Sequence, residues 1–522
     1  MTALKVIRSK FFSKSGLAPL VFLAAVLPFT PDTTLAQQAQ PTGSAPAKPN
    51  ILVILSDDVG YSDLSCYGAT AIRTHNIDRL AAEGLRFTSG YCSASTCTPT
   101  RYSLITGKYA FRTKGTGIAP PNATALIRPG TETIASLLKK AGYRTAVVGK
   151  WHLGLGGPDK PDWNGELNPG PLELGFDYCF ILPTTPDRVP QIFVEDHRVA
   201  GLDPKDPIWV GDHKPFPDFP TGITERDKLR MDWSFGHNDS VVNGIGRIGF
   251  FTGGNAARWR DEELAGAWVQ HAVAWLEKEP TKPFFLYYAP HDIHVPRMPH
   301  QQFWGKSPLG WRGDSILELD WGVGQILQNL ERMGLANNTL SIFSSDNGPV
   351  LDDGYKDQAV EKLGGHKPAG PFSGGKYTIQ EGGTRMPFIT WWPGRIKPGM
   401  SDNIVCTIDL CASLAALAGV PLAPDACPDS LNILDALLGV PGAKGRDELV
   451  EQDNGNAGNY GFRAGEWKLQ RHGRAQGGRR EQLFNLTKDP AEKDDVAAQN
   501  PEVLQRLSAR LDAILAASRT RP

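Results

Sequence analysis

Continuous apolar runs, rather than alternating apolar and polar positions, recur along the first 350 residues. One begins at Asn50 as NILVILS, and similar runs lie within residues 143–154, 282–296 and 338–350. Uninterrupted apolar runs are typical of strands buried on both faces, as in a parallel sheet. Segments with helical periodicity separate them, at residues 76–84, 131–142, 262–279 and 314–334. The alternation predicts an α/β domain with a mostly parallel central sheet flanked by helices.

Three boundaries of the predicted helices can be proposed from single residues. Asn76 is a candidate N-cap for the first helix, and Gly84 is a candidate stop signal at its end. Gly142 ends the second helix in the same way.

The pattern changes after about residue 440. Short strand-like segments occur at residues 459–473 and 481–490, and an amphipathic helix is expected at residues 501–517. We therefore expect a catalytic α/β domain at residues 50–439 and a smaller α+β domain at residues 440–522.

The amino-terminal segment resembles an export signal. It carries four basic residues before an apolar run at residues 16–29, which is too short to span a membrane comfortably. We expect residues 1–36 to be a signal peptide and residues 37–49 to be a flexible lead-in. No other apolar run has spanning length, so the expected location is periplasmic or secreted, without membrane attachment after cleavage.

The 522 residues carry a formal net charge of -1, so no global field favours nucleic acid as a partner. Any positive charge for an anionic substrate must therefore be local. The seven cysteines are an odd number, which leaves at least one outside an intramolecular disulfide in an exported chain. Cys97 is the candidate, and the pairing of the others remains open: Cys66, Cys92, Cys179, Cys406, Cys411 and Cys427.

Polar residues follow several of the predicted strands. The carboxyl ends of parallel strands form one edge of a sheet, where ligand sites of α/β proteins lie. Four oxygen donors are expected together at this edge: Asp57, Asp58, Asp346 and Asn347. Oxygen donors of this kind favour calcium or magnesium over zinc.

A second set of residues is basic or histidine. It consists of Lys150, His152, His294 and Lys376, and His291 is a second-ranked addition. Cations beside a metal ion suit a tetrahedral oxyanion such as sulfate or phosphate.

The stretch STCTPTRYSLITGK, at residues 95–108, places Cys97 just before a predicted helix. Pro99 suits the first helical turn. A thiolate at the positive end of the helix dipole would be acidified, so an ordinary cysteine nucleophile is physically possible.

Taken together, these motifs resemble those of the type I sulfatases, arylsulfatase A-like members of the alkaline-phosphatase superfamily. CTPTR matches their C-x-P-x-R signature, and GKWHLG, SDNG and GGKYTIQEGGTRMPF follow in the same order. The resemblance implies that a maturation enzyme oxidises Cys97 to formylglycine (3-oxoalanine). One hydroxyl of the hydrated aldehyde would attack sulfur, and the second would then lose its proton so that sulfate leaves.

The resemblance also implies a role for each matching residue. Calcium would be bound by Asp57, Asp58, Asp346, Asn347 and a hydroxyl of residue 97. Arg101 would hold the hydrated aldehyde, while Lys150 and Lys376 would bind sulfate oxygens. His294 would bind the ester and help protonate the leaving alcohol, and His152 would take the proton that drives sulfate release.

The chain departs from the family pattern at two places. Thr100 stands where serine or alanine is usual, although the cysteine, proline and arginine of the signature remain. Thr185, in LPTTPD, is the nearest match to a substrate-binding serine of arylsulfatase A.

Three functions remain open at this stage. The first is an exported sulfatase, with a sulfated carbohydrate as the substrate expected by analogy. The second is a formylglycine-dependent phosphonate monoester hydrolase or phosphodiesterase, and the third is a non-catalytic binder of sulfated glycans. Loop residues Arg188, His197 and His366 are candidate partners for a sugar or carboxylate, with surface solvation as the equal alternative.

Overall fold

The computed structural model describes residues 48–455, 458–475 and 478–522, and residues 48–522 form one compact unit. The expected signal peptide, and the expected lead-in up to residue 47, lie outside the described residues. Within the described part, no helix has the length and apolar character needed to cross a membrane.

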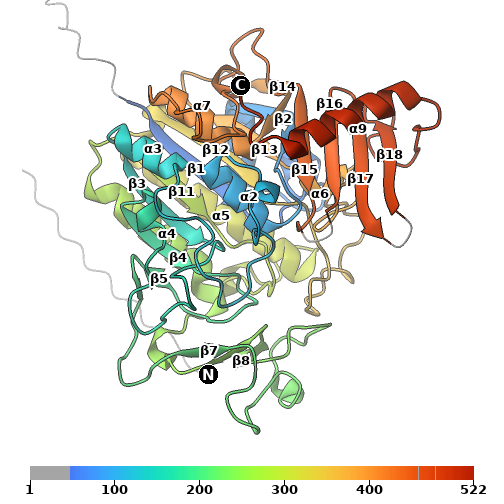
Figure 1. Cartoon of the computed structure of the whole chain (residues 1–522). Helices are drawn as coiled ribbons and strands as arrows, with labels where there is room; N and C mark the ends of the chain where they lie inside the picture. Colours follow the sequence, from blue (N-terminus) through green and yellow to red (C-terminus); the bar gives the residue numbers. More distant parts are fainter. Residues whose placement is uncertain (1–47, 456–457, 476–477) are drawn as a thin grey trace, which may run out of the picture. The chain divides into compact units, whose positions relative to one another are not determined.

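A ten-stranded sheet forms the centre of this unit (Figure 1). In spatial order its strands are β14 (Gly399–Cys406), β2 (Leu85–Tyr91), β13 (Phe388–Trp391), β12 (Thr339–Ser345), β1 (Asn50–Ser56), β11 (Phe284–Ala289), β3 (Arg144–Lys150), β4 (Tyr178–Leu182), β5 (Val194–Glu195) and β6 (Arg198–Val199).

The middle of this sheet is parallel. β12, β1, β11, β3 and β4 pair in parallel, whereas β13 and β5 are antiparallel to their neighbours. Every residue of β1, β11 and β12 is buried, as their continuous apolar runs indicated. The predicted fold class, a mostly parallel sheet flanked by helices, is confirmed.

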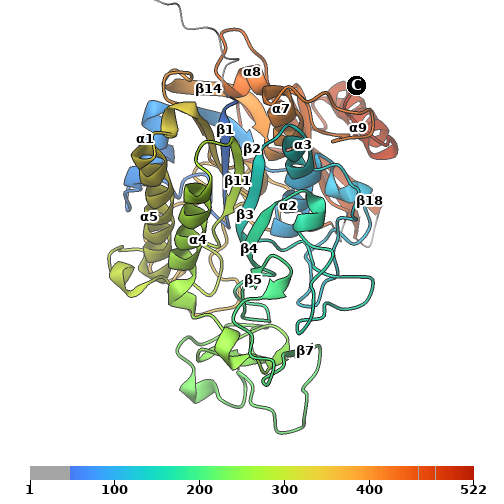
Figure 2. The same ribbon diagram turned by 90° about the vertical axis from the view of Figure 1, so that its left-hand side faces the viewer.

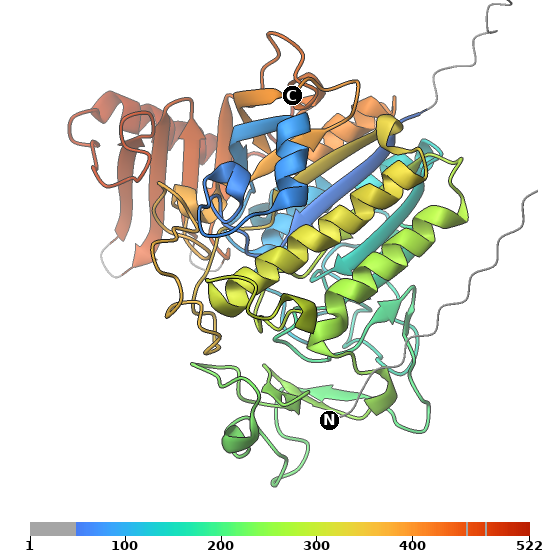
Figure 3. The same cartoon turned by 180° about the vertical axis from the view of Figure 1, so that it is seen from behind.

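Helices cover both faces of the sheet (Figure 2). On one face lie α1 (His75–Glu83), α4 (Leu264–Lys278) and α5 (Gly310–Arg332), and the last two pack side by side in Figure 3. On the other face lie α2 (Cys97–Thr106), α3 (Ile134–Lys140) and α7 (Leu410–Leu417), which contact one another. Two further helices are the single turns α6 (Glu381–Thr384) and α8 (Leu434–Leu437).

The start of α1 corrects one prediction. Its N-cap is Thr74, not Asn76, because the Asn76 side chain donates a hydrogen bond to Asp320 of α5 at 2.9 Å. Gly84 does follow the last helical residue. A long-range contact has thus taken the side chain that local sequence assigned to the cap.

A separate four-stranded antiparallel sheet lies near the carboxyl end. Its strands are β15 (Glu448–Gln452), β16 (Tyr460–Ala464), β17 (Trp467–Ala475) and β18 (Gly478–Asn485), and α9 (Pro501–Ala516) packs on β16 and β17. The expected carboxyl-terminal α+β unit is therefore present, whereas its proposed boundary at residue 440 stays a prediction. Short strands form two small antiparallel pairs, β7 (Trp209–Gly211) with β10 (Phe250–Thr252) and β8 (Val241–Val242) with β9 (Ile245–Gly246).

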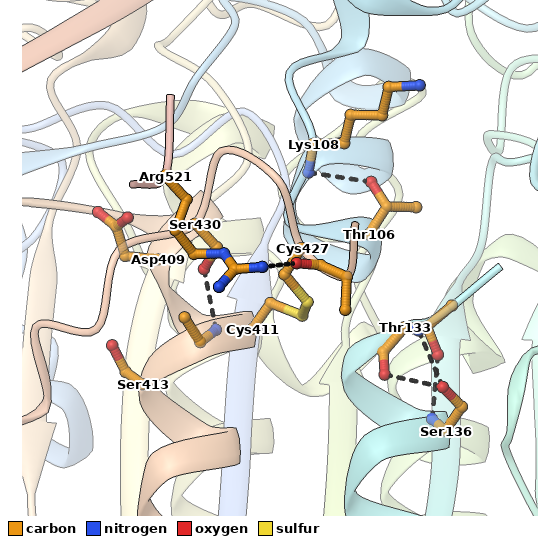
Figure 4. Close-up of a disulfide and its surroundings, with 12 residues drawn as sticks. Thr106, Lys108, Thr133, Ser136, Asp409, Cys411, Ser413, Cys427, Ser430 and Arg521 are labelled. Atoms are coloured by element: carbon orange, nitrogen blue, oxygen red, sulfur yellow. Dashed lines mark hydrogen bonds between the residues drawn. A yellow bond between two sulfur atoms is a disulfide. The ribbon is translucent and has the colours of Figure 1, made fainter. Parts of the chain in front are cut away.

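A disulfide joins Cys411 of α7 to Cys427, beside the carboxyl end of α2 (Figure 4). A Cβ placed on Gly107, which follows α2 with a φ of 60°, would lie 2.5 Å from the Cys427 Cβ. Glycine is therefore required here both for the left-handed turn and for this close approach. The remaining cysteines are free: Cys66, Cys92, Cys97, Cys179 and Cys406.

Candidate active site

Four adjacent parallel strands bring the sequence-predicted residues to one edge of the sheet. Asp57 and Asp58 directly follow β1, Lys150 ends β3, and Asp346 and Asn347 directly follow β12. The segment that contains His294 follows β11, which lies between β1 and β3. All of these side chains are buried.

The oxygen donors contact one another directly. The backbone N–H of Asp58 donates to Asp346 Oδ1 at 3.3 Å, and Asn347 Nδ2 donates to Asp58 Oδ1 at 2.7 Å. Two oxygens, Asp57 Oδ1 and Asn347 Oδ1, are buried without a hydrogen-bond partner among the described residues. Buried oxygens without partners are costly, and a bound cation would satisfy them.

His294 also lies in this group, although the sequence assigned it to the substrate. One of its ring nitrogens and carboxylate oxygens of Asp57 and Asp58 all lie within 4.8 Å of one another. Burial and the nearby carboxylate of Asp346 raise the pKa of Asp57 to about 8. A divalent cation would counter both effects, so the donor set fits a hard metal ion.

Three cationic side chains surround the carboxylates. Arg101 contacts Asp346 Oδ2 at 2.8 Å and also donates to the carbonyl oxygen of Lys150 at 3.0 Å. The Lys150 ammonium pairs with Asp57.

Lys376 bridges Asp58, at 2.9 Å, and Asp353, at 2.8 Å. Burial raises the pKa of Asp58, but Lys376 and Lys150 outweigh it and hold that pKa below its ordinary value.

Cys97 is the first residue of α2, and its side chain is almost fully buried. Burial raises the pKa of its thiol, although Lys150 and Lys376 act in the opposite direction. The direction is opposite to the expected acidification of the thiol, because loss of hydration on burial outweighs the attraction of the two lysines. Thr100 stands where the family usually has serine or alanine. Its hydroxyl donates a hydrogen bond to the carbonyl oxygen of Ala94 at 2.8 Å, so the threonine at this position contacts the backbone.

Each of the two main histidines has one nitrogen engaged by a carbonyl group. His152 Nε2 lies 3.1 Å from the Ala119 oxygen, and its buried Nδ1 has no partner among the described residues. His294 Nδ1 lies 2.8 Å from the Val295 oxygen. Burial, followed by nearby cationic side chains, lowers the pKa of both rings well below the ordinary value. Neutral rings with these partners leave His152 Nδ1 and His294 Nε2 as proton acceptors.

His291, ranked second from the sequence, is held differently. Its Nδ1 accepts a hydrogen bond from the Trp268 indole at 3.2 Å, and burial lowers its pKa to about 3. This ring packs against α4 and supports the fold.

A comparison with protein families identifies the class of enzyme. The family model described as Sulfatase matches residues 49–420. The chain belongs to the sulfatase family. It is an enzyme that hydrolyses sulfate esters.

Relatives of this sulfatase cover nearly all of its length. It is 46% identical over 483 residues to an N-acetylgalactosamine-6-O-sulfatase of Bacteroides thetaiotaomicron, covering 90% of this chain and 94% of the relative. It is 32% identical to human arylsulfatase A, covering 89% of this chain and 88% of the relative. The predicted resemblance to sulfatases is confirmed.

Solved structures agree with this assignment. One, from work on the metabolism of multiple glycosaminoglycans by Bacteroides thetaiotaomicron, has a TM-score of 0.87 and 46% identity, covering 90% of this chain and 100% of the other. A phosphonate monoester hydrolase of Agrobacterium radiobacter has a TM-score of 0.56 and 17% identity, covering 90% of this chain and 95% of that one. That likeness concerns the fold alone.

Sequence reasoning missed a group of residues beside His294 in the sulfatase site. Asp187 Oδ2 lies 3.0 Å from His237 Nε2, and Asp187 Oδ1 lies 3.8 Å from His294 Nδ1. Arg188 pairs with Asp187 at 3.0 Å and donates to Thr185 Oγ1 at 3.0 Å. Thr185, the match to the substrate-binding serine, therefore contacts the Arg188 guanidinium. In the sequence, Asp187 is next to Arg188, and Arg188 was already a candidate loop residue. That adjacency could have indicated Asp187 as well.

The other two loop candidates have carboxylate partners. His197 Nε2 lies 2.8 Å from Glu173, and His366 Nε2 lies 2.8 Å from Asp63, which also binds Arg312. Both rings are engaged in contacts that support loops. Asp353, which was not identified from the sequence, instead lies at the site through its ion pair with Lys376.

Proposed function

We propose that this sulfatase removes the 6-O-sulfate of N-acetylgalactosamine residues in a sulfated glycosaminoglycan. Its 46% identity to a relative of that name, over almost the whole of both chains, carries this proposal. The human N-acetylgalactosamine-6-sulfatase, 32% identical over 410 residues, supports it further. The local positive charge expected for an anionic substrate is available from Arg101, Lys150 and Lys376 around Cys97.

The nucleophile we propose is formylglycine made from Cys97 by a maturation enzyme. This group supplies a hydroxyl that attacks sulfur and a second hydroxyl that allows sulfate to leave. The buried thiol supports the proposal, because its raised pKa makes unmodified cysteine a poor nucleophile. Arg101, held by Asp346, is the cation that would orient residue 97.

Calcium is the metal that we propose for the oxygen donors. It would be held by Asp57, Asp58, Asp346 and Asn347, and it supplies positive charge beside the sulfate group. The unpartnered oxygens of Asp57 and Asn347 support this set. In the structure Lys150 pairs with Asp57 and Lys376 with Asp58. A cation bound to those carboxylates would weaken both pairs and allow the two lysines to bind sulfate oxygens.

The two histidines would handle protons at different atoms. His152 Nδ1 is a free acceptor and can take the proton whose loss drives sulfate release. His294 would serve the leaving alcohol. A bound sulfate ester adds negative charge near its ring, which favours the protonated form and allows Nε2 to donate.

Export of this enzyme is part of the proposal. A disulfide between Cys411 and Cys427 is typical of proteins in oxidising compartments, and a sulfated glycan is a polymer met outside the cell. We therefore place the enzyme in the periplasm or among secreted proteins, with residues 1–36 as its signal peptide.

The substrate proposal is tested by rates on matched sulfated sugars. We expect kcat/KM for the 6-sulfate of N-acetylgalactosamine to exceed that for its 4-sulfate and for the 6-sulfate of N-acetylglucosamine. The physical reason is that a site organised around one ester position and one hydroxyl configuration discriminates strongly through buried polar contacts. Equal rates on all three sugars would contradict the proposal. Comparing the rates of hydrolysis of an aryl phosphate ester and an aryl sulfate ester by one preparation tests the phosphonate monoester hydrolase or phosphodiesterase alternative.

Residue 97 can be examined by peptide mass spectrometry of active enzyme. We expect the peptide to have lost the thiol mass and gained an aldehyde, with turnover proportional to the converted fraction. The Cys97→Ala variant should fold with an unchanged melting temperature within a few degrees and show no turnover. Full activity in a preparation that retains unmodified Cys97 would exclude this nucleophile.

Calcium binding can be measured without activity, by thermal unfolding of metal-stripped protein. Added calcium should raise the melting temperature of the native protein, because a ligand that binds only the folded state stabilises it. The Asp57→Asn variant should lose most of this response. Asp177→Asn, at a half-exposed carboxylate before β4, is the matched control and should keep it. An equal response in both variants would place the cation elsewhere.

Asp187→Asn tests whether Asp187 positions His294. We expect kcat/KM to fall roughly tenfold or more for esters of weakly acidic alcohols, and less for activated aryl sulfates, which need little protonation. Glu173→Gln removes the carboxylate paired with His197 and should leave both rates unchanged. A uniform loss across all leaving groups would mean that Asp187 only supports the fold.

A further inference from the structure

A polar pocket lies between the loop that carries Lys376 and the carboxyl-terminal sheet. Its volume is about 300 Å³. The residues that define its chemistry are Tyr377, Gln380, Gln470, His472, Arg480 and Gln482. None of them was assigned a function above, and they come from two parts of the chain about 90 residues apart.

Tyr377 connects this pocket to the reaction centre. Its backbone N–H donates to the carbonyl oxygen of Ser95 at 2.9 Å, two residues before Cys97. Its hydroxyl donates to Asp353 at 3.0 Å, and Asp353 also pairs with Lys376. The side chain of Tyr377 is 40% exposed. The amphipathic ring of Tyr377 thus borders the pocket on one side and the Asp353–Lys376 pair of the candidate active site on the other.

The pocket is built on one face of the carboxyl-terminal sheet. Side chains alternate between the faces of a strand. In β17 and β18, Leu469 and Leu483 belong to the apolar cluster that also contains Leu507 and Leu511 of α9. The intervening positions point the other way, toward the Lys376 loop.

The inner part of this second face is tied by charge to α6, which lies between the Lys376 loop and β13. Lys468 is fully buried between Glu381 and Glu451, at 2.8 Å from each, and Gln470 donates to Glu492 at 2.8 Å. The outer part is the pocket. The buried ion pairs therefore hold the pocket in a defined place relative to Lys376 and Tyr377.

The outer part offers an unpaired cation and an unpaired polar atom. Arg480, directly opposite His472 in the strand register, is exposed and forms no ion pair with any residue in the described part of the chain. His472 Nε2 is buried and has no hydrogen-bond partner among the described residues. Burial and Arg480 lower the pKa of His472, so Arg480 supplies the positive charge.

We propose that this pocket binds the sugar next to the sulfated one, and that Arg480 binds the carboxylate of a uronic acid at that position. The inference rests on the proposed glycosaminoglycan substrate. Arg480 has the planar, bidentate geometry that suits a carboxylate, and the glutamines, His472 and Tyr377 can contact sugar hydroxyls and ring faces. A sulfate group on the neighbouring sugar is also an anion that Arg480 could bind. The experiment therefore distinguishes a carboxylate from a sulfate at this position.

The test compares Arg480→Ala with the native enzyme on four 6-sulfated substrates. These are the monosaccharide, an oligosaccharide with a neighbouring uronic acid, its carboxyl-reduced form, and the carboxyl-reduced form with a sulfate on the neighbouring sugar. In the native enzyme, kcat/KM should be highest with the uronic acid. Arg480→Ala should lower that value about tenfold or more, through KM, and leave the monosaccharide unchanged.

Arg506→Ala removes an exposed arginine of α9 and is the matched control, expected to behave as native on every substrate. The native enzyme could instead prefer the carboxyl-reduced substrate that carries a sulfate on the neighbouring sugar. If Arg480→Ala then lost that preference, the anion recognised by Arg480 would be sulfate and not the carboxylate. Equal losses on the monosaccharide and the oligosaccharide, or no loss on either, would overturn the pocket's role.

Direct binding separates a failure of this pocket from a failure of the proposed substrate. Calorimetric titration with the desulfated uronic-acid oligosaccharide reports the pocket whichever ester the enzyme cleaves. We expect measurable binding to the native enzyme and to Arg506→Ala, and at least tenfold weaker binding to Arg480→Ala. Indistinguishable titrations of native enzyme and Arg480→Ala would reject the pocket, whereas absent hydrolysis of N-acetylgalactosamine 6-sulfate alone would reject the substrate.

Discussion

Compensation of buried charge is the constraint on which this structure depends. Asp57, Asp58 and Asp346 lie side by side without solvent, and their repulsion is opposed by Arg101, Lys150 and Lys376. Breaking one such buried pair typically costs about 3–5 kcal/mol, because the remaining charge is left without hydration or a partner. The raised pKa of Asp57 indicates that the protein side chains alone do not complete this compensation. The proposed cation and an anionic substrate would enter a site whose charges are already arranged for them.

The same constraint extends to the carboxyl-terminal sheet. Lys468 of β17 is buried with Glu381, which lies five residues after Lys376, and with Glu451 of β15. Tyr91 at the end of β2 also donates to Glu381. These contacts tie the Lys376 loop to both sheets. The small sheet therefore contributes to the geometry of the site and forms one wall of the adjoining pocket.

Local sequence predicted strands and helix starts correctly where a residue pattern is compatible with few backbone structures. The uninterrupted apolar runs predicted β1, β3, β11 and β12, and the parallel arrangement then required the residues after them to share one edge. The CTPTR stretch was correctly placed at a helix start, because proline is accommodated in a first turn. The sequence did not predict that the pKa of the Cys97 thiol is raised. This shift comes from burial, which depends on every segment packed around α2.

The sequence by itself determined the fold class, the family and the set of residues at the sheet edge, because continuous strands and ordered motifs are local properties. Only the tertiary structure decided which side chains share partners. It placed Asp187 beside His294, turned His291 toward Trp268, and gave Asn76 to Asp320 instead of a helix cap. It also brought Arg480 to the same pocket as Tyr377, across a hundred residues of chain. Contacts between distant segments follow from how layers pack and how buried charges are paired, and neither is encoded in the spacing of residues along one element.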